Sequence, residues 1–132
     1  MLKLKYISSL IALLALPAHA DIVWTGAVSD DIFDEANWDL SGSTVTLIDP
    51  NVSIDDDVLI VNAPTPVVIP NLSAQIRFQL GDARTLTVDN SVLIAANNDG
   101  VGGTPGNTNG PTIHLVNGAS LDIFFITHRL TL

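Results

Sequence analysis

Alternating apolar and polar positions recur in three segments of the chain at a nearly constant spacing. Each segment reads apolar, any residue, apolar, any residue, Asn, and together they cover residues 58–62, 86–90 and 113–117. Their asparagines lie 28 and then 27 residues apart. Because side chains alternate between the two faces of a strand, this pattern predicts a short strand with one apolar face. A second apolar strand is expected after each Asn, over residues 67–69, 92–94 and 121–123.

Turn-forming residues separate these strands, at 63–66, at 80–82 and along the stretch 97–111. No helical period of 3.6 residues is present after residue 40. Short strands that repeat at the length of one coil favour an all-β fold, a short right-handed parallel β-helix (solenoid) of about three coils. A β-sandwich is the alternative, because turns recur regularly there too.

The repeated asparagine places the same residue type at the same turn of each coil. Asn tolerates the left-handed backbone conformation, and its amide can hydrogen-bond to the copy in the next coil. We therefore interpret Asn62, Asn90 and Asn117 as an internal structural ladder.

The segment 22–39 differs from the repeats because it holds both tryptophans. A strand is expected at 22–26, followed by a short helical turn with Ser29 or Asp30 as N-cap. The open end of a solenoid needs an atypical cap, so we expect Trp24 and Trp38 to plug that end. The alternative is a carbohydrate-binding module in which the two rings contact a ligand.

The first 20 residues have the three parts of a secretory signal peptide. Lys3 and Lys5 precede an apolar run at 7–16, and an Ala-x-Ala site closes the segment at 18–20. The run is shorter than the ~20 apolar residues that a membrane span requires. We expect an exported protein, extracellular, at the cell surface or in the periplasm and not integral to the membrane. Its parts are then the signal peptide 1–20, the cap and first strands 21–57, and the coils 58–132.

Charge and cysteine content narrow the class of protein. Removing residues 1–20 takes away both lysines and no acidic residue, so the net charge changes from −9 to −11. Phosphate binding depends on clustered Lys and Arg, which excludes nucleic acid as a partner. The chain has no cysteine. An exported domain without disulfides is held by its core alone, which favours a bacterial envelope or secreted protein.

Short motifs add a family resemblance over residues 22–123. Trp-Thr-Gly at 24–26, Asp-Glu-Ala-Asn-Trp at 34–38, the acidic strand at 55–60 and Asn-Gly-Ala-Ser-Leu at 117–121 resemble bacterial secreted β-helix proteins, similar to autotransporter passengers and surface adhesins. The resemblance implies a non-catalytic, adhesin-like or structural surface protein. Phe33 departs from it, because Trp is frequent at that position.

Candidate chemistry is sparse. Asp55, Asp56 and Asp57 form the densest acidic cluster, but its spacing is not that of a calcium loop, and we expect solvated carboxylates and no metal. His114 and His128 lack the partners of a zinc site. No nucleophile elbow is present. We predict no catalytic or cofactor-binding residue and no enzyme activity; a polysaccharide-degrading β-helix enzyme is a third, disfavoured alternative.

The stretch 121–126 is the most apolar of the chain after residue 20. An exposed apolar strand edge can pair with another chain. Two interpretations follow: the coils are a shortened version of a longer protein, which we favour, or this edge is a contact surface. The partners expected are a surface glycan or a second copy that associates through the C-terminal edge.

Overall fold

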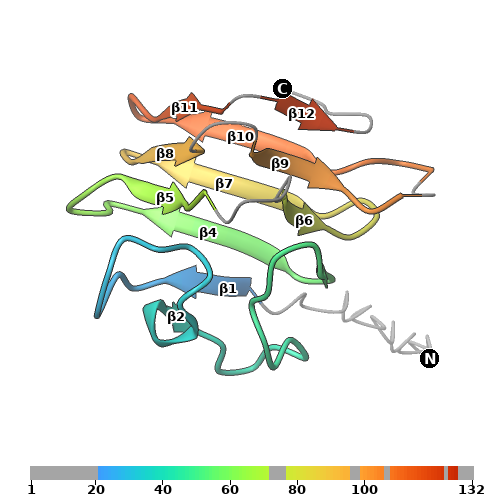
Figure 1. Ribbon diagram of the computed structural model, residues 1–132, viewed down its shortest axis with the longest axis horizontal. Coiled ribbons are helices and arrows are strands. Elements are labelled where there is room, and N and C mark those ends of the chain that lie inside the picture. Colours follow the sequence, from blue (N-terminus) through green and yellow to red (C-terminus); the bar gives the residue numbers. More distant parts are fainter. Residues whose placement is uncertain (1–20, 72–76, 96–98, 106–107, 124, 128–132) are drawn as a thin grey trace, which may run out of the picture.

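The computed structural model describes residues 21–71, 77–95, 99–105, 108–123 and 125–127. The expected signal peptide, residues 1–20, lies outside the described residues. Within those residues the chain consists of strands, turns and one short 3-10 helix (Figure 1). The prediction of an all-β chain is confirmed.

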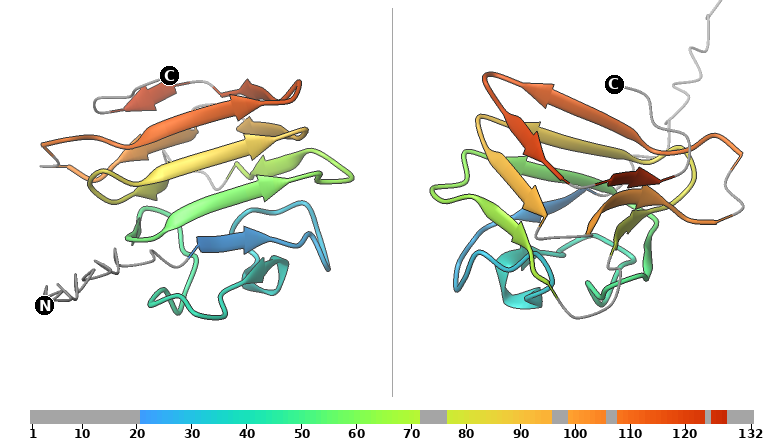
Figure 2. Two further views of the ribbon diagram at one scale, coloured as in Figure 1. Left: turned by 180° about the vertical axis from the view of Figure 1, so that it is seen from behind. Right: turned by 45° about the horizontal axis from the view of Figure 1, so that its top comes forward.

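The strands form three sheets, in which every neighbouring pair is parallel except β1 and β2. The first sheet has the order β10 (Thr112–Val116), β7 (Thr85–Asp89), β4 (Asp57–Val61), β1 (Asp21–Trp24), β2 (Trp38–Asp39). The second has the order β11 (Ser120–Asp122), β8 (Val92–Ala95), β5 (Val67–Ile69). The third has the order β12 (Phe125–Thr127), β9 (Gly100–Gly103), β6 (Arg77–Leu80), β3 (Ser53–Ile54). From β3 onward the chain visits the third, first and second sheets in turn, so that strands far apart in sequence lie side by side (Figures 1 and 2).

The register of the parallel strands stacks like residues on like. In the first sheet Ile22, Val58, Leu86 and Ile113 form one row of register partners, and none is more than 1% exposed. Burying an aliphatic side chain of this size contributes about 1.5–3 kcal/mol to the stability of the folded state. The alternation read from the sequence therefore defines the inner face of the sheet.

The six repeat strands β4, β5, β7, β8, β10 and β11 begin and end within one residue of the expected positions, whereas β1 ends two residues earlier than expected and β2 was not predicted. The third sheet was missed: the prediction that 97–111 is a continuous turn is wrong, because β9 lies inside it, and Leu80 ends β6 instead of starting a turn. Strand β9 is Gly-Val-Gly-Gly and is buried throughout. Glycine has no side chain, so such a strand carries no alternating pattern to read.

Residues 25–52 cover the end of the stack at β1 and β5. The amide of Ile32 donates to Val68 O at 2.9 Å, and the amide of Val68 donates to Asp30 O at 2.7 Å. The segment includes the 3-10 helix η1 (Glu35–Asn37). Its N-cap is Asp34 and not Ser29 or Asp30, which corrects the expectation: Asp34 Oδ1 accepts from the Ala36 amide at 3.2 Å.

Candidate functional site

The three repeated asparagines lie at the turns between the first and second sheets. Asn62, Asn90 and Asn117 directly follow β4, β7 and β10, and their φ angles are 51°, 44° and 52°. Each turn thus uses the left-handed conformation that Asn tolerates better than most residues with a side chain. We call these three residues the turn column.

Side-chain hydrogen bonds link the successive turns of the turn column. Asn90 Nδ2 donates to Asn62 Oδ1 at 2.8 Å, whereas Asn117 Nδ2 donates to Asp89 Oδ1 at 2.7 Å. The uppermost Asn therefore bonds to the residue before Asn90 and not to Asn90 itself. All three side chains are exposed, so the expectation of an internal ladder is corrected to a column on the surface.

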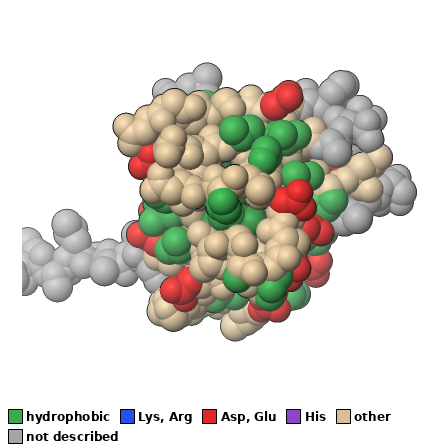
Figure 3. Space-filling model, turned by 90° about the vertical axis from the view of Figure 1, so that its left-hand side faces the viewer, with side chains coloured by type: hydrophobic (Ala, Val, Ile, Leu, Met, Phe, Trp, Pro, Cys, Tyr) green, Lys and Arg blue, Asp and Glu red, His purple; other side chains and the backbone are tan. Residues whose placement is uncertain are grey.

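A shallow groove of about 190 Å³ runs beside the turn column. Its walls come from three successive turns: Ala63, Pro64, Thr65, Pro66, Asn90, Ser91, Val92 and Gly118. Backbone and polar side chains predominate on this face, and acidic side chains flank it (Figure 3). Ser91 holds two of the walls together, because its hydroxyl accepts from the Ala63 amide at 2.9 Å and donates to Asp89 O at 2.7 Å.

The two tryptophans lie inside the cap. Trp24 is 6% and Trp38 7% exposed, and their rings meet edge to face at a centroid distance of 5.1 Å. Trp38 also stacks on Phe78 at 5.9 Å, and its indole N–H donates to Ile32 O at 2.8 Å. A sugar-stacking platform needs an exposed ring face, which neither tryptophan presents here.

Asn37 organises the cap, although its sequence pattern did not predict a structural role for it. It is fully buried, and its Oδ1 accepts from the amides of Val28 at 2.9 Å and Ser29 at 3.0 Å. Its Nδ2 donates to Ser29 Oγ at 2.8 Å and to Asp31 O at 3.1 Å. One amide side chain thus fixes the loop that precedes it. The only signal in the sequence was the Asn-Trp pair of the family resemblance.

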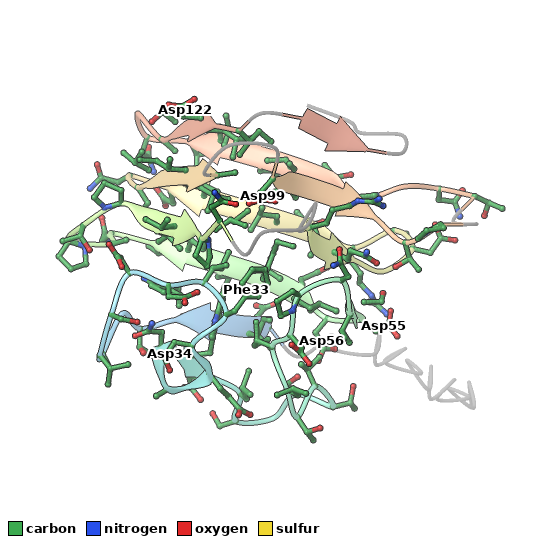
Figure 4. All side chains as sticks on the ribbon, in the orientation of Figure 1. Phe33, Asp34, Asp55, Asp56, Asp99 and Asp122 are labelled. Atoms are coloured by element: carbon green, nitrogen blue, oxygen red, sulfur yellow. The ribbon has the colours of Figure 1, made fainter. Side chains whose placement is uncertain are left out.

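The acidic cluster at 55–57 serves the structure, and the expectation that it is simply solvated is wrong for Asp56. Asp56 is 6% exposed and accepts from the Ser43 hydroxyl and, at 3.3 Å, from the Thr44 amide. Asp57 Oδ1 accepts from the Thr85 amide at 2.8 Å, which joins two coils. Asp55 lies on the outer side of the cluster and is exposed (Figure 4).

Gly81 lies close to the backbone of Ile54 and to Asp55. The Gly81 amide donates to Ile54 O at 2.7 Å, and a Cβ built on Gly81 would overlap the carboxylate of Asp55. The same Cβ would lie 3.2 Å from Ile54 O and 3.3 Å from the Asp55 Cα.

A hydroxyl pair spans two coil steps on the third sheet. Thr104, which follows β9, has its hydroxyl 2.7 Å from the hydroxyl of Ser53 on β3, and its amide donates to Leu80 O at 3.2 Å. Since β6 lies between β9 and β3, this contact reaches across β6.

The remaining ionisable groups of the described residues include one buried carboxyl group, that of Asp99. Asp99 is 1% exposed and lies between the sheets (Figure 4). Hydrogen bonds from the side chain and then the backbone of Ser41 lower the pKa of Asp39. Among the described residues, no three His, Cys, Asp or Glu side chains are grouped closely enough to hold a metal ion. The described part of the chain also contains no helix long and apolar enough to cross a membrane.

Comparison of the chain with protein-family models, with curated proteins and with solved structures found no match.

Proposed function

We propose that this chain is a short right-handed parallel β-helix that acts, after export, as a non-catalytic surface or extracellular protein of adhesin-like or structural character. Its proposed partners are a surface glycan or a second copy of the chain. The residues that we assign to this role are those of the turn column, which form part of the exposed surface.

The observation that carries the proposal is the row of register partners Ile22, Val58, Leu86 and Ile113. Parallel partners at a spacing of one coil are what a solenoid requires. A sandwich of antiparallel sheets would not pair them in this way. Such a stack presents outward side chains in straight rows along a rigid body, which suits a scaffold or a contact surface.

The family resemblance supports the same role. Secreted β-helix proteins of the autotransporter-passenger and adhesin type begin with similar Trp-x-Gly and Asn-Trp motifs. In this chain Trp24, Asn37 and Trp38, which carry those motifs, are all part of the buried cap. No specific observation favours the carbohydrate-binding module that would use Trp24 and Trp38, or the polysaccharide-degrading enzyme, so we propose neither.

A disulfide test addresses the stack directly. Leu59 and Thr87 are register partners on β4 and β7, and Thr87 is in turn the partner of His114 on β10. Strands are about 4.8 Å apart, and disulfides form at Cα separations below about 7 Å. We expect Leu59→Cys/Thr87→Cys to oxidise readily in this cysteine-free chain. The control, Leu59→Cys/His114→Cys, spans two strand spacings and should form no disulfide within one chain; equal intrachain oxidation of both pairs would contradict the stack.

Export is tested separately. The full chain, expressed in a Gram-negative bacterium, should appear outside the cytoplasm with Asp21 as its first residue, as read by mass spectrometry. A charge in the apolar run, Leu13→Arg, should keep the chain in the cytoplasm at its full length. Recovery of uncleaved chain from the cytoplasm in both cases would refute export while leaving the fold untouched.

A further inference from the structure

The two ends of the stack differ. Strands β10, β11 and β12 are the last members of the three sheets, and among the described residues no strand pairs with their outer edges (Figure 1). At the other end, residues 25–52 cover β1 and β5, and β3 is an edge of only two residues. Within the part of the chain that the structure describes, only the end at β10 therefore presents a long strand edge.

In β10, the backbone N–H and C=O groups of every second residue point toward the unpaired edge. The Thr112 amide donates to Arg84 O at 2.8 Å, and Val116 O accepts from the Asn90 amide at 3.2 Å, so both residues face β7. Because alternate residues of a strand direct their N–H and C=O groups to opposite sides, Ile113 and Leu115 face away from β7. The Leu115 side chain occupies the inner row above the fully buried Val88, yet it is 41% exposed. Val116 is 40% exposed.

Charge is sparse at this end. Between Thr112 and Ile123 the only ionisable side chains are those of His114 and Asp122, although the whole chain carries 14 acidic residues. Asp122 is the last residue of β11 (Figure 4). Two such ends can approach each other with little of the repulsion that a net charge of −9 would otherwise impose.

We propose that two copies of this chain pair end to end through their β10 edges, in an antiparallel ladder that makes the first sheet continuous across both copies. The partner must offer a free strand edge with matching apolar positions, and the same end of a second copy supplies one. A two-fold axis through the middle of β10 sets β10 antiparallel to its copy, and it brings β11 opposite the partner's third sheet. Because the capped end offers no comparable edge, the contact is self-complementary and closes at two copies, without growing into a fibre.

This inference rests on the stacked coils of the proposed function and not on export. The measurement is sedimentation equilibrium of the full chain and, in parallel, of the chain from Asp21, over a hundredfold concentration range. We expect dimers in both. Leu115→Lys, which charges the edge, and Leu115→Pro, which removes an N–H that faces away from β7, should give monomers. Val61→Lys is the matched control and should remain dimeric. Val61 is the last residue of β4, away from the β10 edge, and is 37% exposed.

Hydrogen exchange of the unmodified chain provides a readout that needs no variant. The Leu115 amide should exchange quickly at low concentration and become protected as the dimer forms, whereas the His114 amide, which faces β7, should be protected at both. A chain that stays monomeric, oligomers that keep growing with concentration, or dimers that survive Leu115→Lys would each overturn the proposal. Association that requires residues 1–20 would also overturn it. If the Leu59→Cys/Thr87→Cys disulfide forms in a monomeric chain, the parallel stack of strands is supported and only the proposed β10 dimer is refuted.

Discussion

Asn117 donates its side-chain hydrogen bond to Asp89, one residue before the asparagine below it, at 2.7 Å. Asp89 also accepts at its backbone oxygen from the Asn62 amide at 3.0 Å and from the Ser91 hydroxyl at 2.7 Å. This aspartate therefore connects all three levels of the turn column. The identical asparagines of the sequence do not make identical contacts.

The backbone conformation of the turn column gives the first prediction. Replacing Asn90 with Ala removes its hydrogen bond, which is worth about 0.5–1.5 kcal/mol, and places alanine in a left-handed conformation that costs about 1–2 kcal/mol. Asn90→Gly removes the same bond but accepts the conformation. We expect Asn90→Ala to lower the free energy of unfolding by about 1 kcal/mol more than Asn90→Gly does, as measured by urea denaturation. Equal losses would show that the conformation carries no strain.

The buried amide of Asn37 gives the second prediction. Asn37→Ala removes four hydrogen bonds, including those that the amides of Val28 and Ser29 donate, and each such bond is worth about 0.5–1.5 kcal/mol. We expect a loss of about 2–3 kcal/mol in the free energy of unfolding, followed by tryptophan fluorescence. The exposed Asn109→Ala is the matched control and should change stability by less than about 0.5 kcal/mol.

The close approach at Gly81 gives the third prediction. Gly81→Ala should destabilise the chain by about 1 kcal/mol, because the added Cβ makes the Asp55 carboxylate turn away and lies 3.2 Å from Ile54 O and 3.3 Å from the Asp55 Cα. Adding Asp55→Ala removes that carboxylate and should recover part of the loss, leaving the contacts with Ile54 O and the Asp55 Cα. A double-mutant cycle by thermal or urea unfolding measures the recovery. Strict additivity of the two changes would mean that Gly81 is required for another reason.

The sequence predicted the strands in which apolar and polar side chains alternate. Leu86 and Val88 alternate with threonine, and β7 lies within one residue of its expected position. In contrast, β9 has three glycines, and its pairing depends on neighbouring coils that no local pattern reveals. The prediction therefore recovered the repeat strands of the first and second sheets and missed those of the third.

The cap was predicted by composition and missed in detail. Two tryptophans beside a repeat indicated a plug, and both are buried. Asn37 and Asp56 could not be recognised, because a polar residue in a loop normally lies in water. Their burial depends on the amides and hydroxyls that the folded loops direct at them, and those partners converge only in three dimensions.

The burial of Trp24 and Trp38 gives the fourth prediction. Their fluorescence should have a blue-shifted maximum and resist quenching by acrylamide. Because neither ring face is available for stacking, titration with neutral oligosaccharides should leave the emission unchanged. Urea-unfolded chain is the control for full quenching. A saturable change on adding a sugar would reinstate the carbohydrate-binding module.

The acidic cluster at 55–57 gives the fifth prediction. Asp56 and Asp57 accept hydrogen bonds from within the chain, so calcium would have to compete with these bonds. We expect millimolar calcium to raise the melting temperature by no more than the same concentration of magnesium does. A specific rise of more than a few degrees would reveal a site, since a ligand that binds only the native state stabilises it.

The contact between Thr104 and Ser53 bears on how the molecule unfolds. In a stack held only by nearest-neighbour interfaces, repeats can unfold one at a time from an end. A contact that bypasses the middle coil couples the first and third, so fraying of the last coil also disturbs the first. The chain is expected to unfold in a single all-or-none transition, and loss of the Thr104 hydroxyl should broaden it.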